Sequence, residues 1–258
     1  MVRDSASCFG GAIPEVGVIF PAYNEVERGL EATLLAAQAY LGANYARHEL
    51  IVVDDGSTDE TAACAQDLGV CVISQRNQGK GAAVQTGMLT ANAAVRAFTD
   101  ADGACPIEDL DQLMRSVTTE TPVVIGKRTE NTQGLLRAFG HSGMHFLTEA
   151  ILPFGVADTQ CGAKAFTAEA AETLFQSLQN PGFSFDVEVL WNARQRGWKI
   201  GELPVAYNNP AEGSKVHAIR DGLKLLGAVG SLGWQYRRDQ VTQPFRAHKS
   251  APQAAKFS

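Results

Sequence analysis

Several features that mark other classes of protein are missing from this sequence. No window in its 258 residues reaches the roughly 18 apolar residues of a membrane span, and the opening MVRDSASCFGGAIPE contains no apolar core of a secretion signal. Lys and Arg number 22 against 28 Asp and Glu, a net charge of −6, so the broad basic surface of a nucleic-acid binder is absent. We therefore expect a cytoplasmic protein that binds no nucleic acid and touches a membrane at most at its cytoplasmic surface.

Cysteine is scarce and follows no pattern. The five cysteines are odd in number, show no C-x-x-C spacing and lie among apolar or small residues. Such cysteines are typical of a reducing compartment rather than of a disulfide framework or a thiolate metal site. We interpret them as packed thiols.

What the sequence does contain is a regular alternation of two patterns in its first half. An apolar share of 45% is enough for a sizeable core. Short β-branched or aromatic runs predict buried strands at 16–20, 50–53, 70–74, 94–98 and 122–126. Helical patterns lie between them at 25–41 (with Asn24 as the cap), 58–68, 82–93 and 107–117. This alternation predicts an α/β fold with a doubly wound, mostly parallel sheet and helices on both faces.

The second half is less regular. We expect helices at 135–152 and 168–178, a loop at 155–166 and a strand within 199–207. The chain shows no internal repeat. The expected organisation is one catalytic domain over residues 1–236, followed by a basic, flexible tail at 237–258.

Polar segments follow each of the first four predicted strands. They are PAYNE, DDGSTD, QRNQGKG and TDADG. In sheets of this kind, ligands bind beyond the carboxyl ends of the strands, at a switch point in strand order. The strand ends are therefore the predicted site.

Asp100 and Asp102 in TDADG are spaced so that a strand would point both carboxylates to the same side. Mg²⁺ often takes one or two carboxylates together with substrate phosphates, so the pair fits a metal diphosphate. Gly103 would let the backbone approach that ligand. The alternative is an Asp-rich turn leading into the helix at Ile107.

DDGSTD also has two interpretations. Asp54 or Asp55 can accept hydrogen bonds from a nucleoside, or the segment is a turn in which Ser57 or Thr58 caps the next helix. It lacks the glycine and glutamate positions of an EF-hand loop. Lys80, between two glycines, suits an anion at a helix N-terminus, but the spacing of an ATP-binding P-loop is absent.

The order and spacing of these motifs resemble a known family. VIFPAYNE, IVVDDGSTDET, NQGKGAAVQTG and FTDADG look like the nucleotide-sugar half of family 2 glycosyltransferases with the GT-A fold. GKR, DTQCGAKAFT, FSFDVEVL and GSKV are similar to polyprenyl-phosphate sugar transferases. DADGA with DTQCG resembles the dolichyl-phosphate glucosyltransferase branch, since the mannosyltransferase branch more often has a bulky residue after the second Asp.

The resemblance implies a role for each matching residue. Pro21, Ala22, Tyr23 and Glu25 would border the nucleoside, Asp54 or Asp55 would contact it, and Lys80 would lie near the base or diphosphate. Asp100 and Asp102 would hold Mg²⁺ or Mn²⁺, and phosphates would meet Arg128, Arg137, Ser214 and Lys215. The implied donor is UDP-glucose, with GDP-mannose as the alternative, and the implied acceptor is a polyprenyl phosphate.

The chemistry expected is a single displacement that inverts the anomeric carbon. A lipid phosphate has a second pKa of about 6 by analogy with phosphoserine, so it attacks without a general base. One rival is transfer to a hydroxyl of a glycan or small molecule, with Asp158 or Asp186 as base. Taken singly, however, Asp158 fits a turn cap, and Asp186 with Glu188 fits the solvent side of an alternating segment. A second rival is a non-catalytic nucleotide-sugar-binding subunit, against which the presence of both Asp100 and Asp102 argues.

A lipid acceptor also calls for apolar surface. Residues 135–155 and 219–234 combine large apolar side chains with few charges, so they fit either a membrane interface or helices packed on the sheet. Many such transferases have a pair of transmembrane helices after the catalytic domain, and this sequence shows no obvious pair there. We therefore expect contact with a membrane surface or with a membrane partner subunit.

Overall fold

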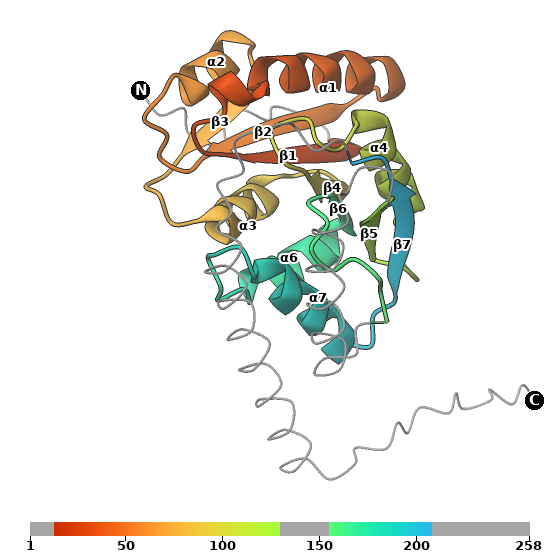
Figure 1. Ribbon diagram of the computed structural model, residues 1–258. Helices are drawn as coiled ribbons and strands as arrows, with labels where there is room; N and C mark the ends of the chain where they lie inside the picture. Colours follow the sequence, from red (N-terminus) through yellow and green to blue (C-terminus); the bar gives the residue numbers. More distant parts are fainter. Residues whose placement is uncertain (1–12, 130–154, 208–258) are drawn as a thin grey trace, which may run out of the picture.

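The apolar runs form the sheet that their pattern predicts (Figure 1). The computed structural model describes residues 13–129 and 155–207, and within them one sheet has seven strands in the order β3-β2-β1-β4-β6-β5-β7. The strands are β1 (Val16–Ala22), β2 (His48–Asp54), β3 (Cys71–Ser74), β4 (Val95–Phe98), β5 (Val123–Arg128), β6 (Lys164–Thr167) and β7 (Ile200–Val205). Each of the first five begins and ends within two residues of its predicted bounds. The mostly parallel α/β sheet is confirmed.

β6 is the strand that the sequence analysis missed. It lies in the segment predicted to be a loop, and it runs antiparallel between β4 and β5. Its four residues are too few for a recognisable period, and DTQCG before them contains mainly turn-forming residues.

The helices follow the predicted pattern except at the first one and at 185–195, a helix that the sequence analysis did not predict. They are α1 (Leu30–Asn44), α2 (Thr61–Asp67), α3 (Lys80–Thr90), α4 (Ile107–Ser116), α6 (Ala168–Gln176) and α7 (Phe185–Gln195). A one-turn 3-10 helix, η2 (Val26–Arg28), precedes α1. Gly29 separates the two with φ +93°, a left-handed backbone that glycine adopts without steric cost. The predicted cap at Asn24 is wrong, because α1 begins after Gly29.

The helix after β2 begins at Thr61 rather than Thr58. The carboxylate of Asp59 accepts from the Thr61 backbone N–H (3.0 Å) and hydroxyl (2.5 Å) at this point. The predicted capping role of Ser57 or Thr58 is therefore wrong; both residues contact the loop after β1 instead.

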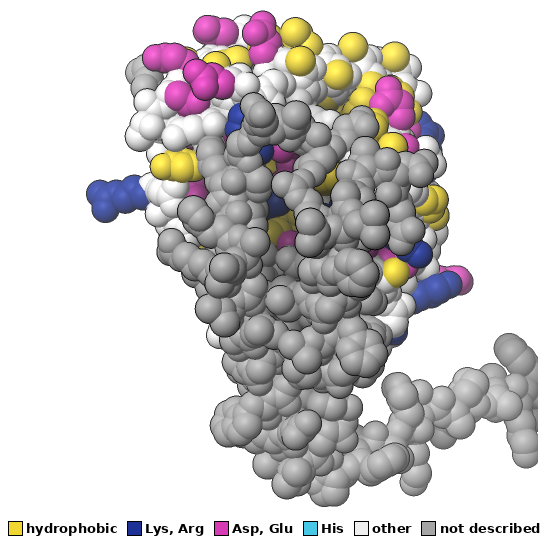
Figure 2. All heavy atoms as spheres, in the orientation of Figure 1, with side chains coloured by type: hydrophobic (Ala, Val, Ile, Leu, Met, Phe, Trp, Pro, Cys, Tyr) yellow, Lys and Arg dark blue, Asp and Glu magenta, His cyan; other side chains and the backbone are white. Residues whose placement is uncertain are grey.

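Helices cover both faces of the sheet (Figure 1). One core cluster packs α1, α2 and α4 against one face, and the other packs α3, α6 and α7 against the opposite face. In the second cluster the ring of Phe98 lies 6.1 Å from that of Phe166 and 5.6 Å from that of Phe185. Exposed acidic side chains gather over α1 and α2, among them Glu31 and Asp67 (Figure 2).

The topology brings most strand ends of interest to one edge. β2 and β3 continue the sheet on one side of β1, and β4 lies on its other side, so the strand order switches at β1. Because β6 is antiparallel, its first residue, Lys164, pairs with Phe98 at the end of β4. The segment before β6 therefore reaches the same edge as the residues after β4. No helix within residues 13–129 and 155–207 has both the length and the apolar character needed to cross a bilayer.

Candidate active site

The loops after β1 and β2 are joined by Asn24. Its backbone N–H donates to Ser57 Oγ (2.9 Å), and its side-chain oxygen accepts from the Thr58 N–H (2.7 Å). Asn24 adopts φ +52°, which asparagine tolerates because its short side chain can hydrogen-bond locally. These bonds join the two segments, each a strand end with the loop after it, that carry the predicted nucleoside residues, namely Pro21, Ala22, Tyr23, Glu25, Asp54 and Asp55.

Asp55 positions the loop that leads to Lys80. Its buried carboxylate accepts from the backbone N–H groups of Gln78 (2.9 Å) and Gly79 (2.8 Å) and from Gln75 Nε2 (2.8 Å). Asp54, also buried, accepts from the Ser57 N–H (3.0 Å). Both aspartates organise loops in this structure, and contact of either with a nucleoside stays a prediction.

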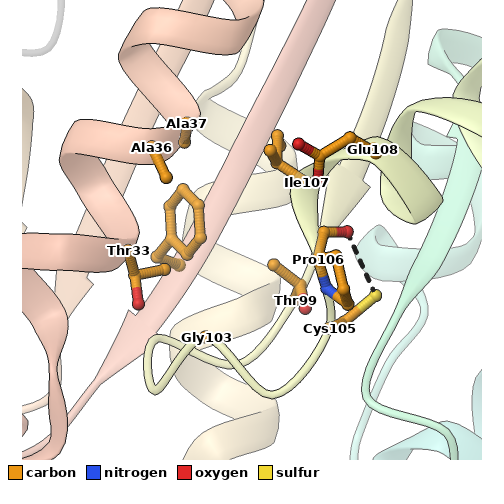
Figure 3. A pocket seen from close by; sticks show the side chains of 10 residues that line it. Thr33, Ala36, Ala37, Thr99, Gly103, Cys105, Pro106, Ile107 and Glu108 are labelled. Atoms are coloured by element: carbon orange, nitrogen blue, oxygen red, sulfur yellow. Dashed lines mark hydrogen bonds between the residues drawn. The ribbon is translucent and has the colours of Figure 1, made fainter. Parts of the chain in front are cut away.

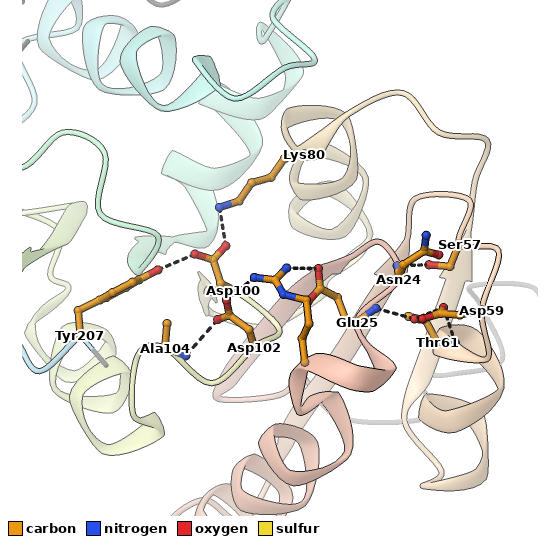
Figure 4. A network of polar contacts seen from close by, with 11 residues as sticks. Asn24, Glu25, Ser57, Asp59, Thr61, Lys80, Asp100, Asp102, Ala104 and Tyr207 are labelled. Atoms are coloured by element: carbon orange, nitrogen blue, oxygen red, sulfur yellow. Dashed lines mark hydrogen bonds and ion pairs between the residues drawn. The ribbon is translucent and has the colours of Figure 1, made fainter. Parts of the chain in front are cut away.

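Lys80 and Tyr207 both bind the Asp100 carboxylate (Figure 4). Lys80 Nζ donates to Asp100 Oδ1 and the Tyr207 hydroxyl donates to Asp100 Oδ2, each at 2.5 Å. Burial opposes the charge on Asp100, but the Lys80 ammonium and these hydrogen bonds outweigh it and hold the pKa of Asp100 below its usual range. Asp100 is therefore ionised and has cationic support from α3.

Asp102 has a different cation. Arg28 NH2 donates to Asp102 Oδ2 (3.1 Å) while NH1 of the same guanidinium donates to Glu25 Oε1 (2.9 Å). The other oxygen of Asp102 accepts from the Ala104 N–H (3.1 Å). Burial, and next the negative charge of Asp100, raise the pKa of Asp102. The sequence analysis missed Arg28, although a cation was to be expected beside strand-end carboxylates.

The two aspartates lie in a turn rather than on a strand. β4 ends at Phe98, and residues 99–104, called here the carboxylate turn, connect it to α4. The reason given for Asp100 and Asp102 sharing a side, alternation along a strand, is therefore wrong. They nevertheless lie close enough that the charge of Asp100 affects the pKa of Asp102.

At two positions of this site, a side chain larger than that of glycine would collide with a neighbouring group. A Cβ on Gly162 would lie 2.4 Å from Asp100 Oδ2 and 2.7 Å from the Tyr207 hydroxyl, so only glycine leaves room for that hydrogen bond. Gly103 has φ +70°, and its missing Cβ would lie 2.8 Å from Thr33 Oγ1 of α1. Gly103 therefore accommodates the turn and α1, which explains it without a ligand.

Arg128 at the end of β5 is paired with Asp158. The guanidinium donates through Nε and NH2 to the two carboxylate oxygens, both at 2.7 Å, and the Arg128 backbone N–H adds a third bond (3.2 Å). The guanidinium also lies 5.7 Å from the centre of the Tyr207 ring. Burial opposes the charge on Asp158, but Arg128 outweighs it and lowers the pKa of that carboxyl. Tyr207, which the sequence analysis missed, thus links Arg128 to Asp100.

Lys164 and Asp186 form a buried pair behind the carboxylate turn. Lys164 is fully buried, its Nζ lies 2.7 Å from Asp186 Oδ1, and it donates to the Cys161 carbonyl (2.5 Å). Burial raises the pKa of Asp186. The interpretation of Asp186 as a solvent-facing residue is wrong, because 185–195 is a helix whose inner face carries it.

A small cavity lies on the α1 side of the carboxylate turn (Figure 3). Its volume is about 140 Å³. The residues that line it come from α1, the end of β1 and the segment from Thr99 to Glu108; they are Phe20, Thr33, Ala36, Ala37, Thr99, Gly103, Cys105, Pro106, Ile107 and Glu108. The turn thus has empty space on one side and Lys80 on the other.

Some predictions fall outside the described residues. These are Arg137, Ser214 and Lys215, the apolar segments 135–154 and 219–234, and the tail 237–258. Within the described ranges, no three His, Cys, Asp or Glu side chains are grouped so that they could hold a metal ion, and the metal role of Asp100 and Asp102 stays a prediction. Cys64, Cys105 and Cys161 form no disulfide and are buried or partly buried, which confirms their interpretation as packed thiols.

Comparison with known proteins gives a consistent result. The family model described as Glycosyl transferase family 2 matches residues 17–175. The dolichyl-phosphate beta-glucosyltransferase ALG5A of Trichomonas vaginalis is 34% identical over 227 residues, which cover 81% of this chain and 70% of that protein. The dolichyl-phosphate beta-glucosyltransferase of Homo sapiens is also 34% identical over 227 residues, covering 78% of this chain and 69% of that protein.

Solved structures agree on the fold. The glucosyl-3-phosphoglycerate synthase of Mycobacterium tuberculosis, crystallised with Mn²⁺, UDP-glucose and phosphoglyceric acid, superposes with a TM-score of 0.68 at 18% identity. The same enzyme with phosphoglyceric acid alone gives a TM-score of 0.67, covering 91% of this chain and 84% of the synthase.

Proposed function

Because the chain belongs to glycosyl transferase family 2 and has the GT-A fold of a glycosyltransferase, we propose that it transfers glucose from UDP-glucose to dolichyl phosphate or a similar polyprenyl phosphate. The names of its relatives from Trichomonas, Drosophila and human support this acceptor and this sugar. GDP-mannose is the alternative donor. We propose Mg²⁺ or Mn²⁺ as the cofactor.

The observation that carries the proposal is the pair of carboxylates at the switch point of the sheet. Asp102 is mostly buried and Asp100 is partly exposed, and each is held by a cation from a different helix. Burial, and next the negative charge of Asp100, raise the pKa of Asp102, and a divalent cation held by the two carboxylates would offset that negative charge. Carboxylate oxygens suit Mg²⁺ and Mn²⁺. When bound, such a cation supplies Lewis acidity for the departing diphosphate.

On the donor side, the residues proposed to border the nucleoside are Pro21, Ala22, Tyr23, Glu25, Asp54 and Asp55. The Asn24 bonds and the Asp55 carboxylate hold their loops rigid before a ligand arrives. Lys80, the first residue of α3, is proposed to donate to the diphosphate. The M. tuberculosis synthase crystallised with Mn²⁺ and UDP-glucose supports this choice of donor at the level of the fold.

On the acceptor side, a lipid phosphate is the nucleophile that fits the charged side chains at the end of β5. Arg128 is proposed to meet the acceptor phosphate with Arg137, Ser214 and Lys215. The hydroxyl-acceptor alternative needs a free carboxylate base, but Asp158 is engaged by Arg128 on both oxygens and Asp186 is buried against Lys164. An ionised phosphate needs no base, so these pairings favour it. A single displacement would invert the anomeric carbon.

The acceptor is a lipid, so we propose that the enzyme works at a membrane surface through residues 135–155 and 219–234 or through a partner subunit. The acidic surface over α1 and α2 would face away from an anionic bilayer, because like charges repel (Figure 2).

The test is a screen for lipid-linked sugar. Purified protein is incubated with UDP-glucose, GDP-mannose or UDP-N-acetylglucosamine, with Mg²⁺ or Mn²⁺, and with a short polyprenyl phosphate. We expect glucosyl lipid from UDP-glucose, lost on addition of EDTA. Product with a glycan hydroxyl acceptor and none with polyprenyl phosphate would refute the proposed acceptor.

A further inference from the structure

Arg28 joins the nucleoside end of the candidate site to the carboxylate turn. One guanidinium nitrogen donates to Glu25 Oε1 (2.9 Å) and another to Asp102 Oδ2 (3.1 Å). The Arg28 side chain is 25% exposed, whereas those of Glu25 and Asp102 are 11% and 12% exposed. The two carboxylates are thus mostly buried, while the guanidinium that joins them is partly exposed to solvent.

The backbone explains why Arg28 reaches both partners. The Arg28 N–H donates to the Glu25 carbonyl (3.0 Å) across the single turn of η2, which puts residues three apart on one side of that turn. Gly29 then ends η2 with its left-handed backbone. Arg28 is therefore anchored by η2 rather than by α1.

The charges around the turn have a small negative sum. Among the described residues, we count the charged groups that pair with Asp100 or Asp102 or act on the pKa of either, together with the ion-pair partners of those groups. They are four acids and three bases: Glu25, Asp100, Asp102 and Asp186 with Arg28, Lys80 and Lys164. The sum is 3 − 4 = −1, and a divalent cation changes it to −1 + 2 = +1. A cation bound alone therefore leaves excess positive charge, which the negative diphosphate of a donor would remove.

A cation on Asp102 also weakens the attraction between that carboxylate and Arg28, because the carboxylate charge is then shared. A guanidinium released in this way has a fork of donors that matches phosphate oxygens. Lys80 stands in the same relation to Asp100, but a phosphate role for Lys80 is already part of the proposed function.

We propose that Arg28 exchanges partners during binding: it neutralises Asp102 in the empty site and donates to the donor diphosphate once a divalent cation occupies the carboxylates. Arg28 thus opposes the binding of a free cation and favours the binding of cation and nucleotide sugar together. The inference rests on the proposed function, from which it takes the cation and the donor.

Mn²⁺ binding tests the first half of this inference without turnover. Free Mn²⁺ is followed by electron paramagnetic resonance during titration of the parent, Arg28→Gln, Arg28→Lys and Arg196→Gln. Arg196 directly follows α7, is exposed, and its guanidinium donates to the Asn192 carbonyl (3.1 Å), so R196Q controls for the loss of one positive charge. We expect R28Q to bind free Mn²⁺ about two- to fivefold more tightly than the parent, because a part-exposed competing ion pair is lost.

UDP-glucose binding in the presence of saturating Mn²⁺ tests the second half. We expect R28Q to bind UDP-glucose about tenfold or more weakly, since a charge-assisted hydrogen bond is lost. R28K keeps the charge but not the fork, so its Mn²⁺ affinity stays near the parent value and its UDP-glucose affinity falls to an intermediate level. If R28Q fails to fold, the R28K result carries the test.

Several outcomes decide the matter. Dissociation constants of R28Q within twofold of those of R196Q in both titrations would overturn the inference. Weaker binding of free Mn²⁺ by R28Q than by the parent would also overturn it, because Arg28 would then prepare Asp102 for the metal. In either case a parent that binds Mn²⁺ and transfers glucose leaves the proposed function standing. A parent that binds no Mn²⁺ with or without UDP-glucose refutes the proposed cofactor and this inference together.

Discussion

Two lysine–aspartate pairs lie at the same edge of the sheet and differ in their access to solvent. Lys80 and Asp100 are 2.5 Å apart, with side chains 20% and 26% exposed. Lys164 and Asp186 are 2.7 Å apart, with side chains 0% and 7% exposed. Each pair affects the pKa of an aspartate in the other, so they act within one local field.

The difference separates a pair that can exchange partners from one that cannot. Water or a ligand can replace Lys80 at Asp100, and the part-exposed pair contributes little to folding. Neither Lys164 nor Asp186 has such a replacement, because each would be left charged in an apolar layer that includes Phe98. We infer that the buried pair supports the fold beneath the exposed one, which is available for ligands.

Removing one member of the buried pair should have the largest effect. Lys164→Met leaves Asp186 buried without its cation, and we expect it to lower the free energy of unfolding by about 3–5 kcal/mol. Chemical denaturation followed by circular dichroism measures this change.

A double variant makes the prediction specific to the pair. Lys164→Met with Asp186→Leu removes both charges, so it should be more stable than Lys164→Met alone. If Lys164→Met unfolds at the same denaturant concentration as the parent, the distinction between the two pairs fails.

A substitution in the exposed pair should lower the transfer activity rather than the stability of the fold. Asp100→Asn removes a proposed metal ligand, and we expect a hundred- to thousandfold loss of kcat/KM, about 3–4 kcal/mol of transition-state stabilisation. The unfolding free energy should change by less than about 1 kcal/mol. Steady-state transfer assays and denaturation of the same preparation measure both.

Glu120→Gln is a suitable control, because Glu120 is an exposed acid on a loop away from the carboxylate turn. It should change neither quantity. Near-normal transfer by Asp100→Asn would remove the metal role from this carboxylate.

The contrast between the pairs also marks where sequence reasoning succeeds. Asp100 follows the buried strand β4 and Lys80 follows the part-buried edge strand β3, both in the parallel half, where apolar runs and strand-end rules point to the same edge. Both residues could be found without knowledge of tertiary contacts, because a strand pattern in the sequence and a polar residue shortly after it were sufficient.

Lys164, Asp186, Tyr207 and Arg28 were missed or misjudged for different physical reasons. Lys164 starts a four-residue antiparallel strand, too short to predict, and Asp186 becomes buried only when α7 packs on the sheet. Tyr207 follows β7 and could have been found by the strand-end rule that found Arg128. Arg28 depends on the break at Gly29, which a continuous helical pattern concealed.

Tyr207 allows the exposed pair to be perturbed more gently. Tyr207→Phe removes the hydroxyl that donates to Asp100 Oδ2 but keeps the ring beside Arg128. We expect Mn²⁺ affinity in the presence of UDP-glucose to fall about fivefold to tenfold, because one hydrogen bond to a charged group is worth roughly 1.5 kcal/mol. Tyr207→Leu, which also removes the ring, should additionally raise the KM for the polyprenyl phosphate. Equal behaviour of the two variants would mean that the ring does not position Arg128.

Asp111 on α4 belongs to a third kind of pair, a buried carboxylate with an exposed cation. Asp111 accepts from the hydroxyls of Tyr40 and Tyr45 and from Arg115 Nε, and although burial opposes its charge, these bonds lower its pKa. A folded pKa below the unfolded value of about 3.9 means stability that is present above that pH and lost as the pH falls through the folded pKa. Asp111→Asn should therefore be less stable than the parent by about 1–2 kcal/mol at pH 7, and this gap should narrow from pH 5 to pH 3. Melting curves of the parent, Asp111→Asn and Glu120→Gln across that range measure it, and a constant gap would show that hydrogen-bond geometry rather than charge gives Asp111 its role.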